Sequence, residues 1–216
     1  MTGSIFNSLS SLFSISDEQA MWRVRMEDDP QAFAQLVQRW EKPIQSLCAR
    51  MTGDLHRGED LAQETFARVF ARRKDYLPSG KFSTFLWRVA LNLCYDELRR
   101  ITRRRESPLE ENFSEPQAEE MAAEAATPDL RMVEEERAEI VRAALLRLEE
   151  TYRAVVVLRH YEGLKFREIS EVLEIPEGTV KSRMAEALSQ LNKILSHTLD
   201  GEETHKKAKQ SERLMI

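Results

Sequence analysis

A strongly acidic stretch divides this chain of 216 residues into two parts. Eleven acidic residues and one basic residue lie between positions 106 and 136, and three prolines interrupt the stretch: Pro108, Pro116 and Pro128. Few apolar residues occur before Leu130, so most of it cannot bury enough surface to offset the entropy of ordering it. We therefore expect a tail at 1–28, a domain at 29–105, a flexible acidic linker at 106–129, a domain at 130–196 and a tail at 197–216.

Apolar residues recur at steps of three and four on both sides of the linker, which is typical of amphipathic helices. Glu, Ala, Leu and Arg are abundant and there are only 7 glycines, a composition that also favours helices. In the N-terminal part the spacing predicts helices at 29–51, at 58–74 and from 83 onward. Pro43 is expected to kink or split the first of them. The predicted fold class is all-α, with two small helical domains.

The C-terminal part ends in a pattern typical of a helix-turn-helix. Two short helices, expected at 165–173 and 177–195, are joined by Glu174, Ile175 and Pro176. Their apolar positions are spaced to form one shared core. The second helix begins with donors that can reach base edges or phosphates, namely Thr179, Lys181, Ser182 and Arg183. The alternative interpretation is a plain helical hairpin.

The helix expected from position 83 combines aromatic and basic residues. Between 81 and 105 there are seven basic and two acidic residues. Phe85 and Trp87 lie in this segment, just before Arg88. Aromatic rings beside cations suit unstacked bases and a single-stranded backbone. On composition alone, a solvated helix with ordinary core aromatics is the favoured alternative.

Taken together and in order, these motifs resemble the extracytoplasmic-function sigma factors, RNA polymerase sigma factors of the sigma-70 family. In the N-terminal domain the resemblance rests on Asp60-Leu61-Ala62-Gln63-Glu64-Thr65-Phe66, Phe85-Leu86-Trp87-Arg88-Val89-Ala90-Leu91-Asn92, Asp96, Arg99 and Arg100. In the C-terminal domain it rests on Tyr161-Glu162-Gly163-Leu164-Lys165-Phe166-Arg167-Glu168-Ile169 and Gly178-Thr179-Val180-Lys181-Ser182-Arg183. The ordered set is far more specific than any one motif.

The resemblance implies a sigma factor that binds core RNA polymerase and directs initiation by reading the −10 and −35 elements of promoter DNA. It implies core polymerase contacts by Asp60, Gln63, Glu64 and Phe66. It implies −10 contacts by Phe85, Trp87, Arg88, Asn92, Asp96, Arg99 and Arg100. It implies −35 contacts by Thr179, Lys181, Ser182 and Arg183. An anti-sigma factor is a further implied partner.

Two positions depart from the family pattern. Phe85 stands where the family usually has Trp, and Glu174 stands in the turn where it usually has Gly. A left-handed backbone at a residue other than glycine costs on the order of 1 kcal/mol, so the turn is expected to be strained. Five basic and five acidic residues lie between 163 and 195, which predicts weak or narrow −35 contacts.

Other classes of protein fit the sequence less well. An ordinary helix-turn-helix regulator leaves the 60–66 motif unexplained, and an enzyme lacks a phosphate loop, a nucleophile elbow or a metal cluster, so no cofactor is expected. Cys48 and Cys94 are expected to be buried thiols, with a redox switch as the alternative. No apolar run approaches the roughly 18–20 residues of a membrane span, so we expect no membrane insertion and a cytoplasmic location.

Overall fold

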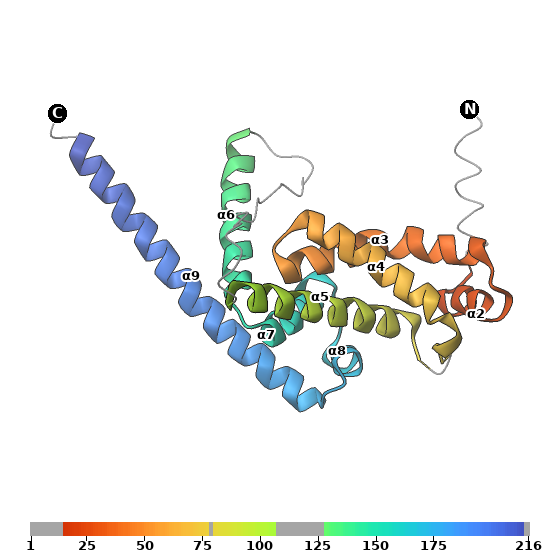
Figure 1. Cartoon of the computed structure of the whole chain (residues 1–216). Helices are drawn as coiled ribbons and strands as arrows, with labels where there is room; N and C mark the ends of the chain where they lie inside the picture. The colour runs from red at the N-terminus through yellow and green to blue at the C-terminus, as the bar shows by residue number, and fades with distance from the viewer. Residues whose placement is uncertain (1–14, 78–79, 107–127, 214–216) are drawn as a thin grey trace.

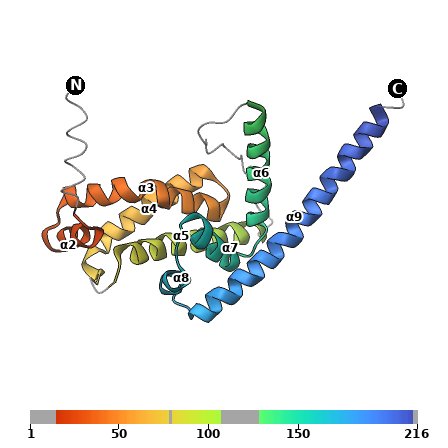
Figure 2. The same ribbon diagram turned by 180° about the vertical axis from the view of Figure 1, so that it is seen from behind.

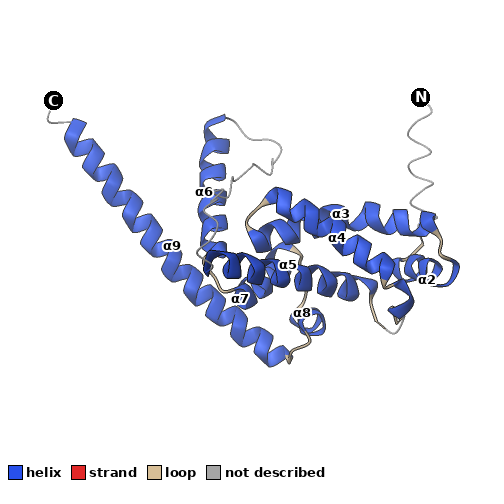
Figure 3. Ribbon diagram, in the orientation of Figure 1, coloured by secondary structure: helices blue, strands red, loops and turns tan. Residues whose placement is uncertain are grey.

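The computed structural model describes residues 15–77, 80–106 and 128–213. The described residues form helices and loops without a strand, which confirms the all-α fold class (Figure 3). The first domain contains α2 (Asp17–Glu27), α3 (Pro30–Thr52), α4 (Leu55–Ala71), the short 3-10 helix η1 (Arg73–Asp75) and α5 (Phe82–Glu106). The second contains α6 (Pro128–Leu146), α7 (Glu150–Val156), η2 (Val157–Tyr161), α8 (Phe166–Leu173) and α9 (Glu177–Arg213). In both views α9 runs along the side of the molecule opposite α2 (Figures 1 and 2).

The expected N-terminal tail is wrong for residues 17–27, which form α2. Ser16 begins this helix with a capping box: its hydroxyl accepts from Gln19 N at 3.1 Å, and the Gln19 side chain accepts from Ser16 N at 3.2 Å. Three apolar residues of α2 are fully buried: Ala20, Met21 and Val24. This helix therefore belongs to the core of the first domain. Residues 1–14 of the predicted tail lie outside the described part.

The first expected helix is one continuous element, α3, so of the two effects expected of Pro43, a kink or a split, the split is wrong. Asp29 caps its start by accepting from Gln31 N and Ala32 N, and Gly53 ends it in a left-handed conformation at φ 83°. Apolar residues on both sides of Pro43 are buried in the core. Tertiary packing of this face stabilises the helix across the proline.

Gly58 allows α3 and α4 to approach closely. A Cβ atom at this position would lie 2.7 Å from Ala49 N and 2.8 Å from Ala49 Cβ. We expect Gly58→Ala to lower the free energy of unfolding by about 1–2 kcal/mol, because the overlap outweighs the roughly 1 kcal/mol that alanine gains over glycine inside a helix. Urea denaturation would measure the change. Gly178→Ala is the control, because a Cβ there meets open space; a stabilised Gly58→Ala protein would contradict the prediction.

The C-terminal half differs from expectation in its helix ends. Helix α7 is continued by a π-helix, η2. The expected C-terminal tail at 197–216 continues α9 through Arg213. Most of the expected linker, residues 107–127, lies outside the described part of the chain. Within the described residues, no helix is long and apolar enough to cross a membrane.

The two domains share one buried core and contact each other directly. Buried Arg153 of α7 donates to the carbonyl oxygen of Met51 at the end of α3. Arg50 of the same helix lies 3.7 Å from the Glu162 carboxylate and stacks on the Tyr161 ring at 4.3 Å. These contacts hold the second domain against the end of α3 and alongside α5.

Candidate nucleic-acid and polymerase interfaces

Helices α8 and α9 form the helix-turn-helix predicted from the sequence. Ile169, Val172, Val180 and Met184 are buried between them, as the apolar spacing required. The turn is tied by the Ser170 hydroxyl, which donates to Ile175 O at 2.5 Å. The shared core and the tight turn exclude the plain helical hairpin.

Glu174 adopts the left-handed conformation expected of this turn, with φ 55° and ψ 40°. Its N–H donates to Ser170 O, which caps the last turn of α8. The turn thus keeps a geometry that glycine would adopt without strain, although a glutamate occupies it.

The four predicted −35 residues gather in the first two turns of α9. Lys181 and Ser182 are exposed, and Thr179 and Arg183 are partly exposed. Lys181 Nζ pairs with the Glu177 carboxylate at 2.7 Å, one turn away, and this contact faces solvent. The start of α9 therefore presents hydroxyl and cationic donors at the positive end of a helix.

The predicted −10 residues occupy two different environments on α5. Asn92, Asp96, Arg99 and Arg100 are exposed. In contrast, Trp87 is 4% exposed and packs edge-on against the Trp40 ring at 5.6 Å, inside the core. The structure therefore places Trp87 apart from the exposed residues.

Phe85 and Arg88 of the predicted −10 set are partly exposed. The Phe85 ring packs against Tyr76 at 5.5 Å, which holds it at the edge of the core. Arg88 faces α8, where it forms an ion pair and two hydrogen bonds. The sequence did not indicate this contact, because it joins residues more than eighty positions apart.

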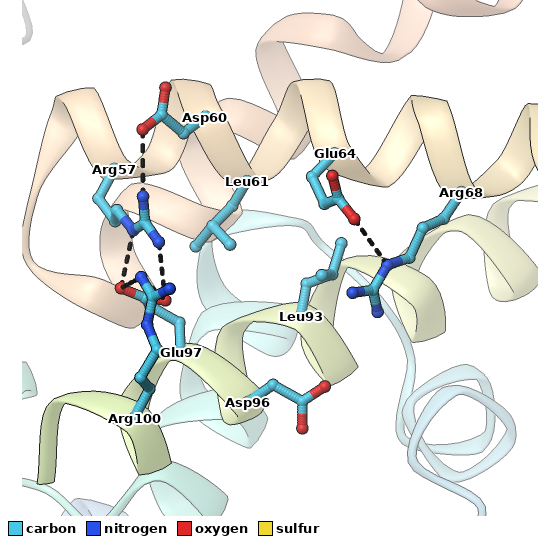
Figure 4. Close-up of a pocket in the computed structure, with 9 residues that line it drawn as sticks. All are labelled: Arg57, Asp60, Leu61, Glu64, Arg68, Leu93, Asp96, Glu97 and Arg100. Carbon is cyan, nitrogen blue, oxygen red and sulfur yellow. Dashed lines mark hydrogen bonds and ion pairs between the residues drawn. The ribbon is translucent and has the colours of Figure 1, made fainter. Parts of the chain in front are cut away.

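The predicted polymerase contacts lie on α4. Asp60, Gln63 and Glu64 are exposed, whereas Phe66 is 6% exposed and packs in the core. Asp60 and Glu64 border a hollow of about 370 Å³ between α4 and α5 (Figure 4). This hollow is also lined by Asp96 and Arg100 from the predicted −10 set, so the two predicted surfaces meet along it.

Arg57 and Glu97 join the two helices on the wall of this hollow. Glu97 accepts from Arg57 Nε and Nη2, both at 2.8 Å, and pairs with Arg100 Nη2 at 2.7 Å (Figure 4). Burial raises the pKa of Glu97, but the hydrogen bonds from Arg57 and Arg100 outweigh this effect and hold the pKa below its ordinary value. Sequence analysis missed both residues, since nothing in the pattern connects two charges forty positions apart.

Comparisons with known proteins agree with this architecture. Residues 36–105 match the family model of sigma-70 region 2, and residues 138–191 match that of sigma-70 region 4. The ECF RNA polymerase sigma factor SigW of Bacillus subtilis (strain 168) is 33% identical over 171 residues, covering 77% of this chain and 90% of SigW. The chain is an extracytoplasmic-function sigma factor.

Another relative supports the same assignment, and a solved structure shares the fold. The ECF RNA polymerase sigma-E factor of Escherichia coli (strain K12) is 30% identical over 182 residues, which cover 80% of this sigma factor and 91% of the relative. The solved structure of RpoE in complex with the anti-sigma factor NepR from Bartonella quintana shares the fold, with a TM-score of 0.62 at 19% identity. The structural match covers 76% of this chain and 96% of RpoE.

The family resemblance drawn from the sequence is therefore confirmed. This sigma factor binds core RNA polymerase and directs promoter-specific initiation of transcription through its regions 2 and 4. The competing class of ordinary helix-turn-helix regulators fails, because it offers no account of the region 2 match.

Proposed function

We propose that region 2 reads and opens the −10 element with one face of α5. The observation that carries this proposal is a row of polar side chains at Arg88, Asn92, Asp96 and Arg99, of which the last three are exposed. Steps of four, four and three keep these residues on one side of a helix. Cations, an amide and a carboxylate along one face suit both the backbone and the base edges of an opened strand.

Two aromatic residues support this face in different ways. Phe85 is half-buried at the start of α5, and its ring can stack on an unpaired base. Trp87 packs on Trp40 and fixes α5 from the core side. We assign base contact to Phe85 and a supporting role to Trp87.

Region 4 reads the −35 element with the start of α9. A helix-turn-helix places the N-terminal residues of its second helix in the major groove. In α9 these residues are Thr179, Lys181, Ser182 and Arg183. Arg183 can pair bidentately with a guanine, and Lys181 can pair with phosphate. The balance of five acidic and five basic residues between 163 and 195 favours a narrow set of contacts over broad electrostatic attraction.

Core polymerase binds the exposed face of α4. Asp60, Gln63 and Glu64 offer carboxylate and amide groups there, in the domain that also reads the −10 element. An anti-sigma factor is the proposed regulatory partner, supported by solved neighbours that are complexes: RpoE with NepR, and CnrH with the cytosolic domain of CnrY at a TM-score of 0.60. This sigma factor is proposed to act in the cytoplasm without catalytic activity of its own.

The division between the two reading surfaces predicts different defects for two substitutions. Arg183→Ala should weaken −35-dependent promoters by about 1–3 kcal/mol if the guanidinium pairs with a guanine. Asn92→Ala should impair promoter opening even where the −35 element is ideal, and a pre-melted template should partly rescue it. Transcription with core polymerase across a promoter library would identify the templates, and permanganate footprinting of thymines would report opening.

Matched controls come from the same chain. Asn192→Ala repeats the amide loss on an exposed face of α9, and Arg23→Ala repeats the guanidinium loss on α2. Both should leave initiation near wild type. Identical defects for Arg183→Ala and Asn92→Ala on duplex and pre-melted templates would refute the division of labour.

A further inference from the structure

The first helix of the helix-turn-helix covers part of the proposed −10 surface. Arg88 Nη1 lies 2.9 Å from Glu174 Oε1, and Arg88 Nη2 donates to Glu171 O at 2.6 Å. Arg88 Nε donates to Val172 O at 3.4 Å. One guanidinium thus holds a carboxylate and the last carbonyl groups of α8.

A second ion pair lies two helical turns away along α5. Lys81 Nζ donates to Glu168 Oε1 at 2.7 Å, at the opposite end of α8. Lys81 directly precedes α5 and lies seven residues before Arg88, and both side chains contact α8. Helix α8 therefore lies along two turns of α5 with its acidic residues against the basic ones.

These contacts offer α5 the same chemistry that DNA offers. The carboxyl end of a helix carries partial negative charge on its unpaired carbonyl groups, and the Glu174 carboxylate adds a full charge at this end of α8. A guanidinium that is occupied in this way cannot also bind a phosphate or a base edge. We propose that α8 is an internal competitor for −10 DNA, which region 4 must release before α5 can read the promoter.

Glu174 is the residue that most favours this interpretation. Its left-handed backbone at φ 55° is a conformation in which glycine is free of strain. Glycine at this position would have no carboxylate to offer Arg88. The strain belongs to the turn itself and is the same whether α8 lies on α5 or apart from it, so it does not affect the competition, whereas the ion pair with Arg88 does.

The proposed −35 surface on α9 also lies close to α5, which carries the proposed −10 surface. Tyr95 of α5 is close enough to Arg183 of α9 for the guanidinium to oppose the effect of burial, which raises the pKa of Tyr95 to about 12. Arg183 thus lies beside α5, the helix that carries Arg88, although the two arginines are proposed to read different promoter elements. Binding of a promoter at both elements requires the domains to separate.

Energy transfer between the domains of the full chain tests the closed arrangement without DNA. Cys48 and Cys94 are fully buried, so dyes can be placed on Ala67→Cys in α4 and Ser189→Cys in α9, both at exposed positions. Arg88→Glu places like charges together and should reduce the closed-to-open ratio by tenfold or more, with lower transfer. Adding Glu174→Arg restores opposite charges and should recover the transfer. Unchanged transfer in Arg88→Glu, or no recovery in the double variant, overturns the proposal.

Binding of a random single-stranded DNA oligonucleotide tests the competition. An exposed ion pair shifts an equilibrium by only a few-fold, so Glu174→Gly should tighten binding by about two- to fivefold. Glu186→Gln removes the same charge from region 4 at an exposed position of α9 and should tighten it less. Equal tightening in these two variants also overturns the proposal.

The inference rests on the proposed role of Arg88 in DNA binding. The charge swap distinguishes a failure of the competition by α8 from a failure of that DNA-binding role. If α8 competes with DNA, the Arg88→Glu, Glu174→Arg double variant recovers energy transfer but not DNA binding. If both are recovered, the contact between the domains stands and the assignment of Arg88 to DNA fails. If neither variant alters the transfer while Arg88→Glu weakens DNA binding, the competition fails and the DNA role stands.

Discussion

Replacing Arg153 with alanine is expected to lower the free energy of unfolding by about 3–5 kcal/mol, because each buried carbonyl oxygen left without a donor costs roughly 1–3 kcal/mol. The Arg153 side chain donates to Leu145 O at 3.0 Å, Leu146 O at 2.7 Å and Leu148 O at 2.8 Å, and also to Met51 O. The residue is only 7% exposed. Alanine would leave several of these carbonyl oxygens buried without a donor.

The position of these carbonyls explains why a cation is tolerated in the core. Leu145 and Leu146 end α6, and Met51 lies in the last turn of α3, so Arg153 binds the negative ends of two helices at once. Burial lowers the pKa of Arg153, while the nearby Glu150 carboxylate opposes the effect. An arginine keeps its charge even so. The residue therefore joins region 4 to region 2 through main-chain groups.

Urea denaturation monitored by circular dichroism would measure this effect. Arg159→Ala is the matched control, because Arg159 is exposed and donates to Leu164 O at 3.1 Å; it should cost less than about 1 kcal/mol. Arg153→Lys should fall between the two, since an ammonium group has three donors on one atom and cannot span the same carbonyls. A cost below about 1 kcal/mol for Arg153→Ala would contradict the network.

Sequence periodicity predicted the helices well wherever one apolar face repeats over several turns. It identified the helix-turn-helix because four buried residues, Ile169, Val172, Val180 and Met184, mark the facing sides of two short helices. It missed α2 because that segment is short and carries only three buried apolar residues, while Trp22 and Met26 remain exposed. A capping box at Ser16 and Gln19 was the signal available for finding it.

The candidate site was predictable where it follows one helix and not where it joins several. The exposed face of α5 follows from steps of three and four, but burial of Trp87 depends on Trp40 of another helix. The pairing of Arg88 with Glu174 depends on how the two domains pack. The sequence pattern does not indicate how the two domains pack, so this contact could be found only from the structure.

The unfolding free energy should fall as the pH rises from about 4.5 to about 7, because of Glu162 in the contact between the domains. Its side chain is 9% exposed, and burial raises its pKa to about 7, although Arg50 opposes the shift. Its Oε1 atom accepts no hydrogen bond from the described residues. Across this range the folded protein keeps a proton that the unfolded chain has lost, so the stabilisation present at low pH disappears.

Glu162→Gln should remove this dependence, since the amide resembles the protonated carboxyl group and does not titrate. We expect the substitution to raise the unfolding free energy by up to about 3 kcal/mol at pH 8, which is the energy of the pKa shift, and to change it little near pH 4. Chemical denaturation at a series of pH values would measure both. Glu171→Gln, which removes an exposed carboxylate on α8, should leave the pH profile near wild type. Equal effects of Glu162→Gln at pH 4 and pH 8 would show that its carboxyl group has no raised pKa, because a raised pKa destabilises the folded protein only at pH values where the unfolded carboxyl group has lost its proton.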